Sequence, residues 1–118
     1  MSETKVLLKL YGPLGSVELE VLADTEATFT KISKDAAAKL GLEVKYQTPV
    51  ELADGRIMPR HLALAEVEIE GVKRPVLVAV AENEERPLLG YTTLEALGFK
   101  VNPLTRKLEK TVAIEYWL

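Results

Sequence analysis

The chain of 118 residues contains no cysteine, one histidine and no long hydrophobic run, and each absence excludes a class of protein. Without cysteine there is neither a disulfide framework nor a thiolate nucleophile. The single histidine, His61, excludes a multi-histidine metal site within one chain. No apolar stretch reaches the roughly 20 residues that span a bilayer. The N-terminal residues show no charged-then-apolar secretion signal, so we expect a cytoplasmic protein with no membrane partner.

The charge balance likewise gives no sign of a nucleic-acid partner. The formal net charge is −3, and the 15 Lys and Arg residues form no basic block and no aromatic–basic interleaving. A nucleic-acid-binding surface requires a concentrated positive patch. The composition, with 47% hydrophobic and 28% charged residues, is that of an ordinary globular protein. The length predicts one domain over residues 1–118.

Short apolar segments separated by dense turn signals predict a mainly β fold. Residues 5–11 and 17–22 flank the sequence Gly-Pro-Leu-Gly, which predicts a hairpin. Asp54-Gly55 lies between two further β-compatible stretches and is a preferred hairpin turn. Residues 75–81 are nearly all apolar, which is typical of a central strand. We therefore expect a closed or nearly closed barrel.

Two short helices are predicted beside the strands. The first covers residues 33–40, where a serine can cap the N-terminus and Gly41 can end the helix. The second covers residues 93–97 and ends at Gly98. The charged residues 82–86 are predicted to form a solvated loop.

Residues 21–30, Val-Leu-Ala-Asp-Thr-Glu-Ala-Thr-Phe-Thr, contain the strongest candidate for catalytic chemistry. An apolar run leads into Asp24 and Thr25, and small and β-branched residues follow them. The chain has only two other aspartates, Asp35 in the first predicted helix and Asp54 in the hairpin turn. Neither has an apolar strand leading into it. One chain thus supplies one candidate catalytic carboxylate.

Taken together, these elements resemble a retroviral-type (retropepsin-like) aspartic protease lobe. The chain looks like a cellular single-lobe member in which Asp-Thr-Glu replaces Asp-Thr-Gly. The resemblance implies a mainly β closed barrel with two short helices. It is carried by four features in the order of the family: a catalytic loop at residues 22–28, a flap hairpin at Asp54-Gly55, the sequence Pro87-Leu88-Leu89-Gly90 beneath the loop, and a short helix at residues 93–98.

Aspartic proteolysis requires two carboxylates that share one proton, because like charges at that distance cannot both ionise. One carboxylate takes a proton from the attacking water, and the other polarises the peptide carbonyl. Because one chain supplies only Asp24, the resemblance implies a homodimer with both Asp24 side chains on a two-fold axis. It also implies that Thr25 bonds across that axis and that no metal or organic cofactor takes part.

The apolar and aromatic C-terminal residues 112–118 also fit a dimer. In the resembled family, terminal strands of both chains interleave in one sheet. The alternative is a C-terminal strand that packs on its own barrel.

The expected substrate is a peptide or a flexible protein segment, which would lie extended in the cleft between the subunits. The residues expected to contact it come from the catalytic loop, the flap and the segment beneath the loop: Glu26, Ala27, Thr28, Asp54, Gly55, Arg56, Ile57, Leu88 and Leu89.

Glu26 stands where the resembled family has glycine, which lets the backbone approach substrate and tolerates unusual dihedrals. Glutamate adds bulk and negative charge, so a dimer would gather four carboxylates at the floor of the cleft. Two functions therefore remain. The first is a homodimeric aspartic endopeptidase. The second is a catalytically weak or inactive dimeric module that binds peptides or has a structural role.

Overall fold

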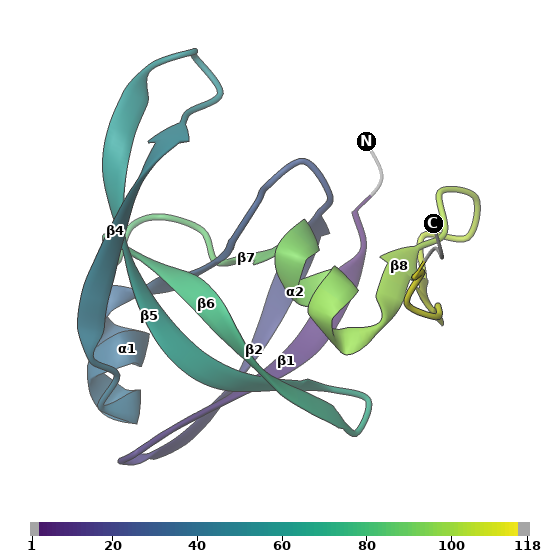
Figure 1. The fold of residues 1–118 in the computed structure, drawn as a ribbon, viewed down its shortest axis with the longest axis horizontal. Helices are drawn as coiled ribbons and strands as arrows, with labels where there is room; N and C mark the ends of the chain where they lie inside the picture. The colour runs from purple at the N-terminus through teal and green to yellow at the C-terminus, as the bar shows by residue number, and fades with distance from the viewer. Residues whose placement is uncertain (1–2, 116–118) are drawn as a thin grey trace.

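The structure, a computed structural model, describes residues 3–115 and is mainly β with two short helices (Figure 1). In chain order the elements are β1 (Lys5–Gly12), β2 (Gly15–Asp24), β3 (Thr30–Ser33), α1 (Lys34–Leu40), β4 (Val44–Glu51), β5 (Ile57–Ile69), β6 (Val72–Ala81), β7 (Leu88–Gly90), α2 (Tyr91–Leu97), β8 (Phe99–Val101) and β9 (Leu108–Lys110).

Six of these strands form a closed barrel, as the sequence predicted. The order in the sheet is β1-β2-β7-β3-β6-β5, and β1 also pairs with β5, which closes the ring. β4 pairs with the outer part of β5 and lies beyond the ring. β6, which contains the predicted central strand, lies between β3 and β5.

Alternating side chains fill the barrel. In β1, Val6, Leu8 and Leu10 point inward and are buried, whereas Lys5 and Leu7, which alternate with them, are exposed. This period of two is what a strand with one buried face requires. The rest of the interior is made of apolar residues from the other strands and from α2, among them Val21, Ile32, Val67, Val78, Leu89, Leu94 and Phe99.

Both helices form where turn chemistry allows them. The Ser33 side chain caps α1 as predicted, and Gly41 ends it with φ 70°. α2 ends at Gly98 with φ 80°, also as predicted, but it begins at Tyr91, two residues before the predicted start. Its N-cap is Gly90, which has no side chain to signal the start.

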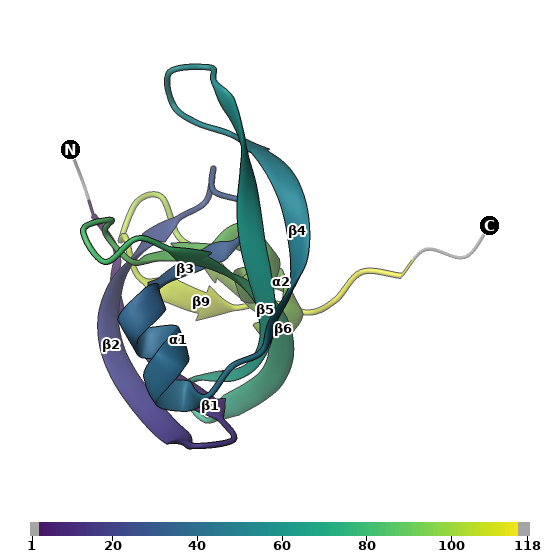
Figure 2. The same cartoon turned by 90° about the vertical axis from the view of Figure 1, so that its left-hand side faces the viewer.

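The two predicted hairpins are both present. In the first, Gly12 pairs directly with Gly15, and the Leu14 N–H donates to the Leu40 carbonyl at 3.0 Å, which ties this turn to the end of α1. In the second, the loop covers residues 52–56 and is closed by a 2.8 Å bond from the Leu52 N–H to the Arg56 carbonyl. We call β4, this loop and residues 57–60 the flap hairpin; it projects from the barrel in Figures 1 and 2.

The C-terminal part of the chain leaves the barrel after a small second sheet of β8 and β9. Residues 111–115 have no regular secondary structure and run away from the body (Figure 2). Val112 and Ile114 are 83% and 71% exposed. Of the predicted interface strand 112–118, residues 116–118 lie outside the described part of the chain. No helix within residues 3–115 has the length and apolar character to cross a membrane.

Candidate active site

Asp24 is the last residue of β2, where that strand leaves the barrel. It lies opposite Gly90 in the parallel ladder with β7. Its half-buried side chain accepts a 3.0 Å hydrogen bond from the Glu26 N–H through Oδ1, and its backbone carbonyl accepts one from the Ala27 N–H at 3.1 Å. The apolar run thus delivers a carboxylate onto a tight turn. The second oxygen, Oδ2, accepts no hydrogen bond within residues 3–115.

The turn of residues 24–28 is held from below by the start of α2. The Tyr91 N–H donates to the Ala27 carbonyl at 2.8 Å. The Thr92 N–H and hydroxyl both donate to the Thr28 carbonyl, at 3.2 and 2.6 Å. These bonds replace the intrahelical partners that the first N–H groups of any helix lack. The position of the turn is therefore fixed by the helix and not by loop residues alone.

Beneath the turn, β3, β7 and α2 meet in a buried polar contact that sequence reasoning missed. The Thr30 hydroxyl donates to the Thr93 hydroxyl at 2.7 Å and accepts the Gly90 N–H at 3.0 Å. Both threonines are fully buried. A Cβ added to Gly90 would lie 2.3 Å from the carbonyl carbon of Phe29, so only glycine allows the chains to approach this closely. The one available sequence signal was the glycine after Leu88-Leu89.

Glu26, which stands where the resembled family has glycine, is exposed. Among residues 3–115 the only non-glycine residues with positive φ are Glu70 and Arg106. Glu26 therefore occupies ordinary backbone space, and this turn does not require the conformational freedom of glycine. What glutamate adds is a charge and a side chain beside Asp24.

The other predicted loop residues divide by exposure. Thr25 and Thr28 are exposed, and Ala27 is half-buried. Leu88 is half-buried on the outer face, whereas Leu89 is 0% exposed inside the barrel. We therefore assign Leu89 to the core beneath Asp24 instead of to the predicted substrate-contacting surface.

The predicted flap residues gather at the end of the flap hairpin. Asp54 accepts the Arg56 N–H at 3.0 Å and the Arg56 Nε at 2.6 Å, which shapes the loop. Gly55 has φ 88° and nothing within 4 Å of an added Cβ, and Ile57 is 63% exposed. The hairpin and the Asp24 turn rise from the same end of the barrel (Figures 1 and 2).

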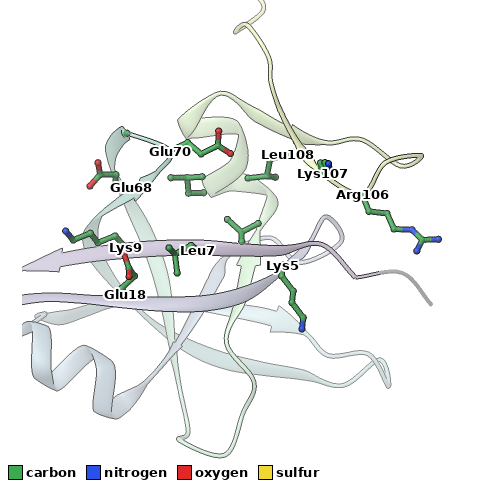
Figure 3. Close-up of a pocket in the computed structure, with 12 residues that line it drawn as sticks. Lys5, Leu7, Lys9, Glu18, Glu68, Glu70, Arg106, Lys107 and Leu108 are labelled. Atoms are coloured by element: carbon green, nitrogen blue, oxygen red, sulfur yellow. The ribbon is translucent and has the colours of Figure 1, made fainter.

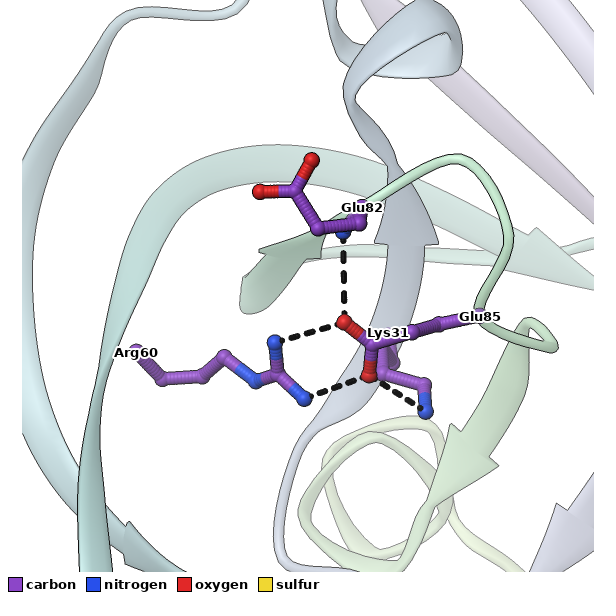
Figure 4. A network of polar contacts seen from close by, with 4 residues as sticks. All are labelled: Lys31, Arg60, Glu82 and Glu85. Atoms are coloured by element: carbon purple, nitrogen blue, oxygen red, sulfur yellow. Dashed lines mark hydrogen bonds and ion pairs between the residues drawn. The ribbon is translucent and has the colours of Figure 1, made fainter.

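The loop of residues 82–86 is not simply solvated, contrary to the sequence prediction. Glu85 accepts two hydrogen bonds from the Arg60 guanidinium, at 2.7 and 3.0 Å, and lies 3.4 Å from the Lys31 Nζ (Figure 4). The Arg60 side chain is only 10% exposed. The Arg60 hydrogen bonds, opposed by partial burial, lower the pKa of Glu85 to about 2. The charged sequence of residues 82–86 did not indicate that Glu85 pairs with Arg60, at the base of the flap hairpin.

A pocket of about 650 Å³ lies elsewhere, between β1, the β5–β6 turn and the β8–β9 loop (Figure 3). Its lining mixes cations such as Lys5 and Arg106 with the carboxylates of Glu18 and Glu68. It contains none of the predicted site residues. In residues 3–115 no three His, Asp or Glu side chains form a group that could hold a metal ion.

A closed six-stranded barrel with an aspartate turn at the end of one strand and a projecting hairpin defines the architecture of a single-lobe acid protease. A family model described as "gag-polyprotein putative aspartyl protease" matches residues 13–96, most of the chain. The chain belongs to this aspartyl protease family.

Among solved structures, the chain is similar to the EIAV protease complexed with the inhibitor HBY-793. The two share 20% identity over 82% of this chain and 89% of that one, with a TM-score of 0.65. At this identity the likeness shows the fold, which is the retropepsin-like single-lobe barrel. No curated protein matches the chain.

Proposed function

We propose that the chain is a single retropepsin-like domain that forms a homodimeric aspartic endopeptidase. The observation that supports it most strongly is the Asp24 turn: a half-buried carboxylate at the end of β2, with one oxygen held by the Glu26 N–H at 3.0 Å. One turn of this kind supplies one carboxylate. A second copy related by a two-fold axis supplies the other.

In this proposal the two Asp24 carboxylates share one proton. The ionised carboxylate takes a proton from water as the water oxygen bonds to the peptide carbonyl carbon, and the protonated one donates to the carbonyl oxygen. The C–N bond then breaks, and a proton passes to the leaving nitrogen. The products are a carboxylic acid and an amine. Thr25, exposed beside Asp24, would brace the turn against its mate across the axis.

The substrate would be an extended peptide or flexible protein segment held by the flap hairpins and by the two Asp24 turns. Glu26, Ala27, Thr28 and Leu88 would contact it from below, and residues 54–57 from above. Strand-like backbone bonds from the flap hairpins would supply affinity with little sequence preference. A cytoplasmic location remains a prediction from the sequence.

The proposal is tested with unfolded casein or a peptide library in the acid range, with and without a pepstatin-type inhibitor. We expect cleavage that the inhibitor blocks and that Asp24→Asn abolishes. Asp35→Asn is the matched control, because Asp35 is an exposed aspartate in the first turn of α1, outside the turn of residues 24–28. Retained cleavage by the Asp24→Asn variant would refute the assignment.

The exposed Glu26 supports a second candidate, a dimeric module that binds peptides without turning them over. Because four carboxylates would gather in a dimer, the charge of Glu26 disfavours the ionised Asp24 carboxylate, which must take the proton from water. Glu26→Gly separates the two functions. We expect it to raise cleavage if Glu26 only slows the reaction. If neither the wild type nor this variant cuts any substrate, the peptide-binding module is the better description.

A further inference from the structure

Asp24 and Lys31 project from the same face of the barrel sheet. Asp24 lies opposite Gly90 in the β2–β7 ladder, and Lys31 lies opposite Leu88 in the β7–β3 ladder. Residues opposite each other in a ladder share a face, and so do residues two apart along a strand, such as Leu88 and Gly90. Two strand spacings and a two-residue offset put the two backbone positions about 12 Å apart.

Arg60 reaches the same face from β5. It precedes Leu62 by two residues, and Leu62 lies opposite Ala79, which in turn lies opposite Lys31. Glu85, in the loop before β7, contacts Arg60 on this face (Figure 4). Three charged groups from distant parts of the sequence thus meet beside the strands that carry the Asp24 turn.

Among Lys31, Arg60 and Glu85 there are two positive charges and one negative charge. The Glu85 carboxylate accepts both Arg60 bonds and also the Glu82 N–H at 3.3 Å, so its oxygens are largely occupied. Lys31 makes the longest contact, 3.4 Å to an oxygen that Arg60 already holds at 2.7 Å. Two cations therefore share one anion. The Lys31 ammonium has three N–H donors, and among residues 3–115 this carboxylate is its one ion-pair partner.

We propose that Lys31, held beside the Arg60–Glu85 pair, forms a cationic subsite that receives a Glu or Asp side chain of the substrate. This inference rests on the proposed function, because it places the bound peptide across the face that carries Asp24. Lys31 is a specificity-determining residue. Arg60 and Glu85 are positioning residues, because the Arg60 bonds occupy the carboxylate that would otherwise neutralise Lys31.

The separation from Asp24 makes such a subsite physically reasonable. An acidic substrate residue close to Asp24 and Glu26 would be repelled by both carboxylates. An acidic residue bound at Lys31, about 12 Å from Asp24, is separated from it by more than one Debye length, which is roughly 8 Å at physiological ionic strength. An extended peptide covers about 12 Å in roughly four residues. The acidic side chain is therefore expected within about four residues of the bond that is cut.

Binding to the Asp24→Asn variant tests this without requiring turnover. The probes are two fluorescent peptide libraries of about ten residues, roughly the length that spans 33 Å when extended. They differ only in a Glu or a Gln at one fixed position, which is moved along the peptide in successive pairs. We expect the Glu library to bind about tenfold more tightly at one position, as one charge-assisted contact gives. The preference should weaken as salt is added.

Substitutions at Lys31 test whether this residue causes the preference for Glu over Gln. Lys31→Met should abolish the preference for Glu, and Lys31→Arg should retain it, which also shows that the fold tolerates change at this position. Lys34→Met is the matched control: Lys34 is three residues away, exposed and paired with Glu82 at 2.7 Å. It should leave the preference unchanged.

The two proposals fail in different ways. Equal affinity for the Glu and Gln libraries, binding of neither, or a Glu preference that survives Lys31→Met would each overturn the subsite. Absence of cleavage by the wild type and by Glu26→Gly, with the Lys31-dependent preference intact, would overturn only the peptidase. Cleavage with no preference for Glu would overturn only the subsite.

Discussion

The buried hydroxyls of Thr30 and Thr93 are hydrogen-bonded to each other at 2.7 Å, and Thr30 also accepts the N–H of Gly90, the residue opposite Asp24. This contact joins β3, β7 and α2 directly behind the candidate catalytic turn. It is also fully buried, so water cannot replace a lost partner.

Thr30→Val keeps the shape of the side chain but removes the acceptor of the Gly90 N–H. We expect it to lower the free energy of unfolding by about 1–3 kcal/mol, measured by urea denaturation. Thr93→Val should have a smaller effect, because Thr30 can still accept from Gly90. Equal losses from the two variants would contradict this reading of the network.

Gly90→Ala should destabilise the fold through steric overlap and not through backbone strain. Gly90 has φ −85°, which any residue adopts, but an added Cβ would lie 2.3 Å from the Phe29 carbonyl carbon. We expect a loss of about 1–3 kcal/mol together with lower cleavage, because the turn of residues 24–28 must move.

Gly55→Ala is the contrasting control for Gly90→Ala. Gly55 has φ 88° and open space around it, so its substitution adds only the left-handed backbone penalty, about 1–2 kcal/mol. Melting curves and cleavage rates of both variants separate the two causes. If Gly55→Ala lowers stability more than Gly90→Ala, close packing at Gly90 is not the dominant constraint.

Glu85→Gln should lower stability in a pH-dependent way. The pKa of Glu85 is lowered by its Arg60 hydrogen bonds from 4.5 to about 2 in the folded chain. A lowered folded-state pKa stabilises the fold above the unfolded value, and this contribution is lost as pH falls from about 4.5 toward 2. Removing the carboxylate also leaves Arg60 buried without its partner, which we expect to cost about 2–3 kcal/mol near pH 7.

Thermal melts of the wild type and Glu85→Gln between pH 7 and acid conditions measure this effect. The gap between the two proteins should be constant at neutral pH and should narrow in the most acidic samples. Glu84→Gln serves as the control, because Glu84 is exposed in the same loop. A constant gap at every pH would show that ionisation of Glu85 does not stabilise the fold.

Deleting residues 112–118 should convert a dimer into monomers. Within the described chain this tail contains Val112 and Ile114, which are 83% and 71% exposed, and the segment of residues 111–115 runs away from the barrel (Figure 2). Sedimentation of the full and shortened chains measures the change, and cleavage should fall with dimer content. Leu104→Ser is the control, since it removes an even more exposed apolar residue, 89% exposed, from the β8–β9 turn. An unchanged dimer would remove the tail from the interface.

Elements with a local signal could be predicted from the sequence. Short apolar segments between turn residues indicated the longer strands, Ser33 and Gly41 indicated α1, and turn residues placed both hairpins, because these signals act between near neighbours in the chain. The start of α2 had no such signal, since its N-cap is Gly90. The resemblance supplied the order of the candidate site elements.

Contacts between distant segments could not be read from the sequence. Thr30 and Thr93 are separated by 63 residues, and Arg60 and Glu85 by 25. Each is an ordinary polar residue until the barrel closes and brings the partners together. The burial of Leu89 likewise depends on which face β7 turns inward, and a three-residue strand is too short to show that by alternation.

Strand β5 pairs with three different strands along its length. Its pairing with β6 begins at His61, and its pairing with β1, which closes the ring, involves Glu66 to Glu68; residues 57–60 pair with β4 alone. Bending at this junction would break no ring hydrogen bond. The ring pairings therefore place no direct constraint on residues 57–60, and the contact that ties this stretch to the barrel is the ion pair of Arg60 with Glu85.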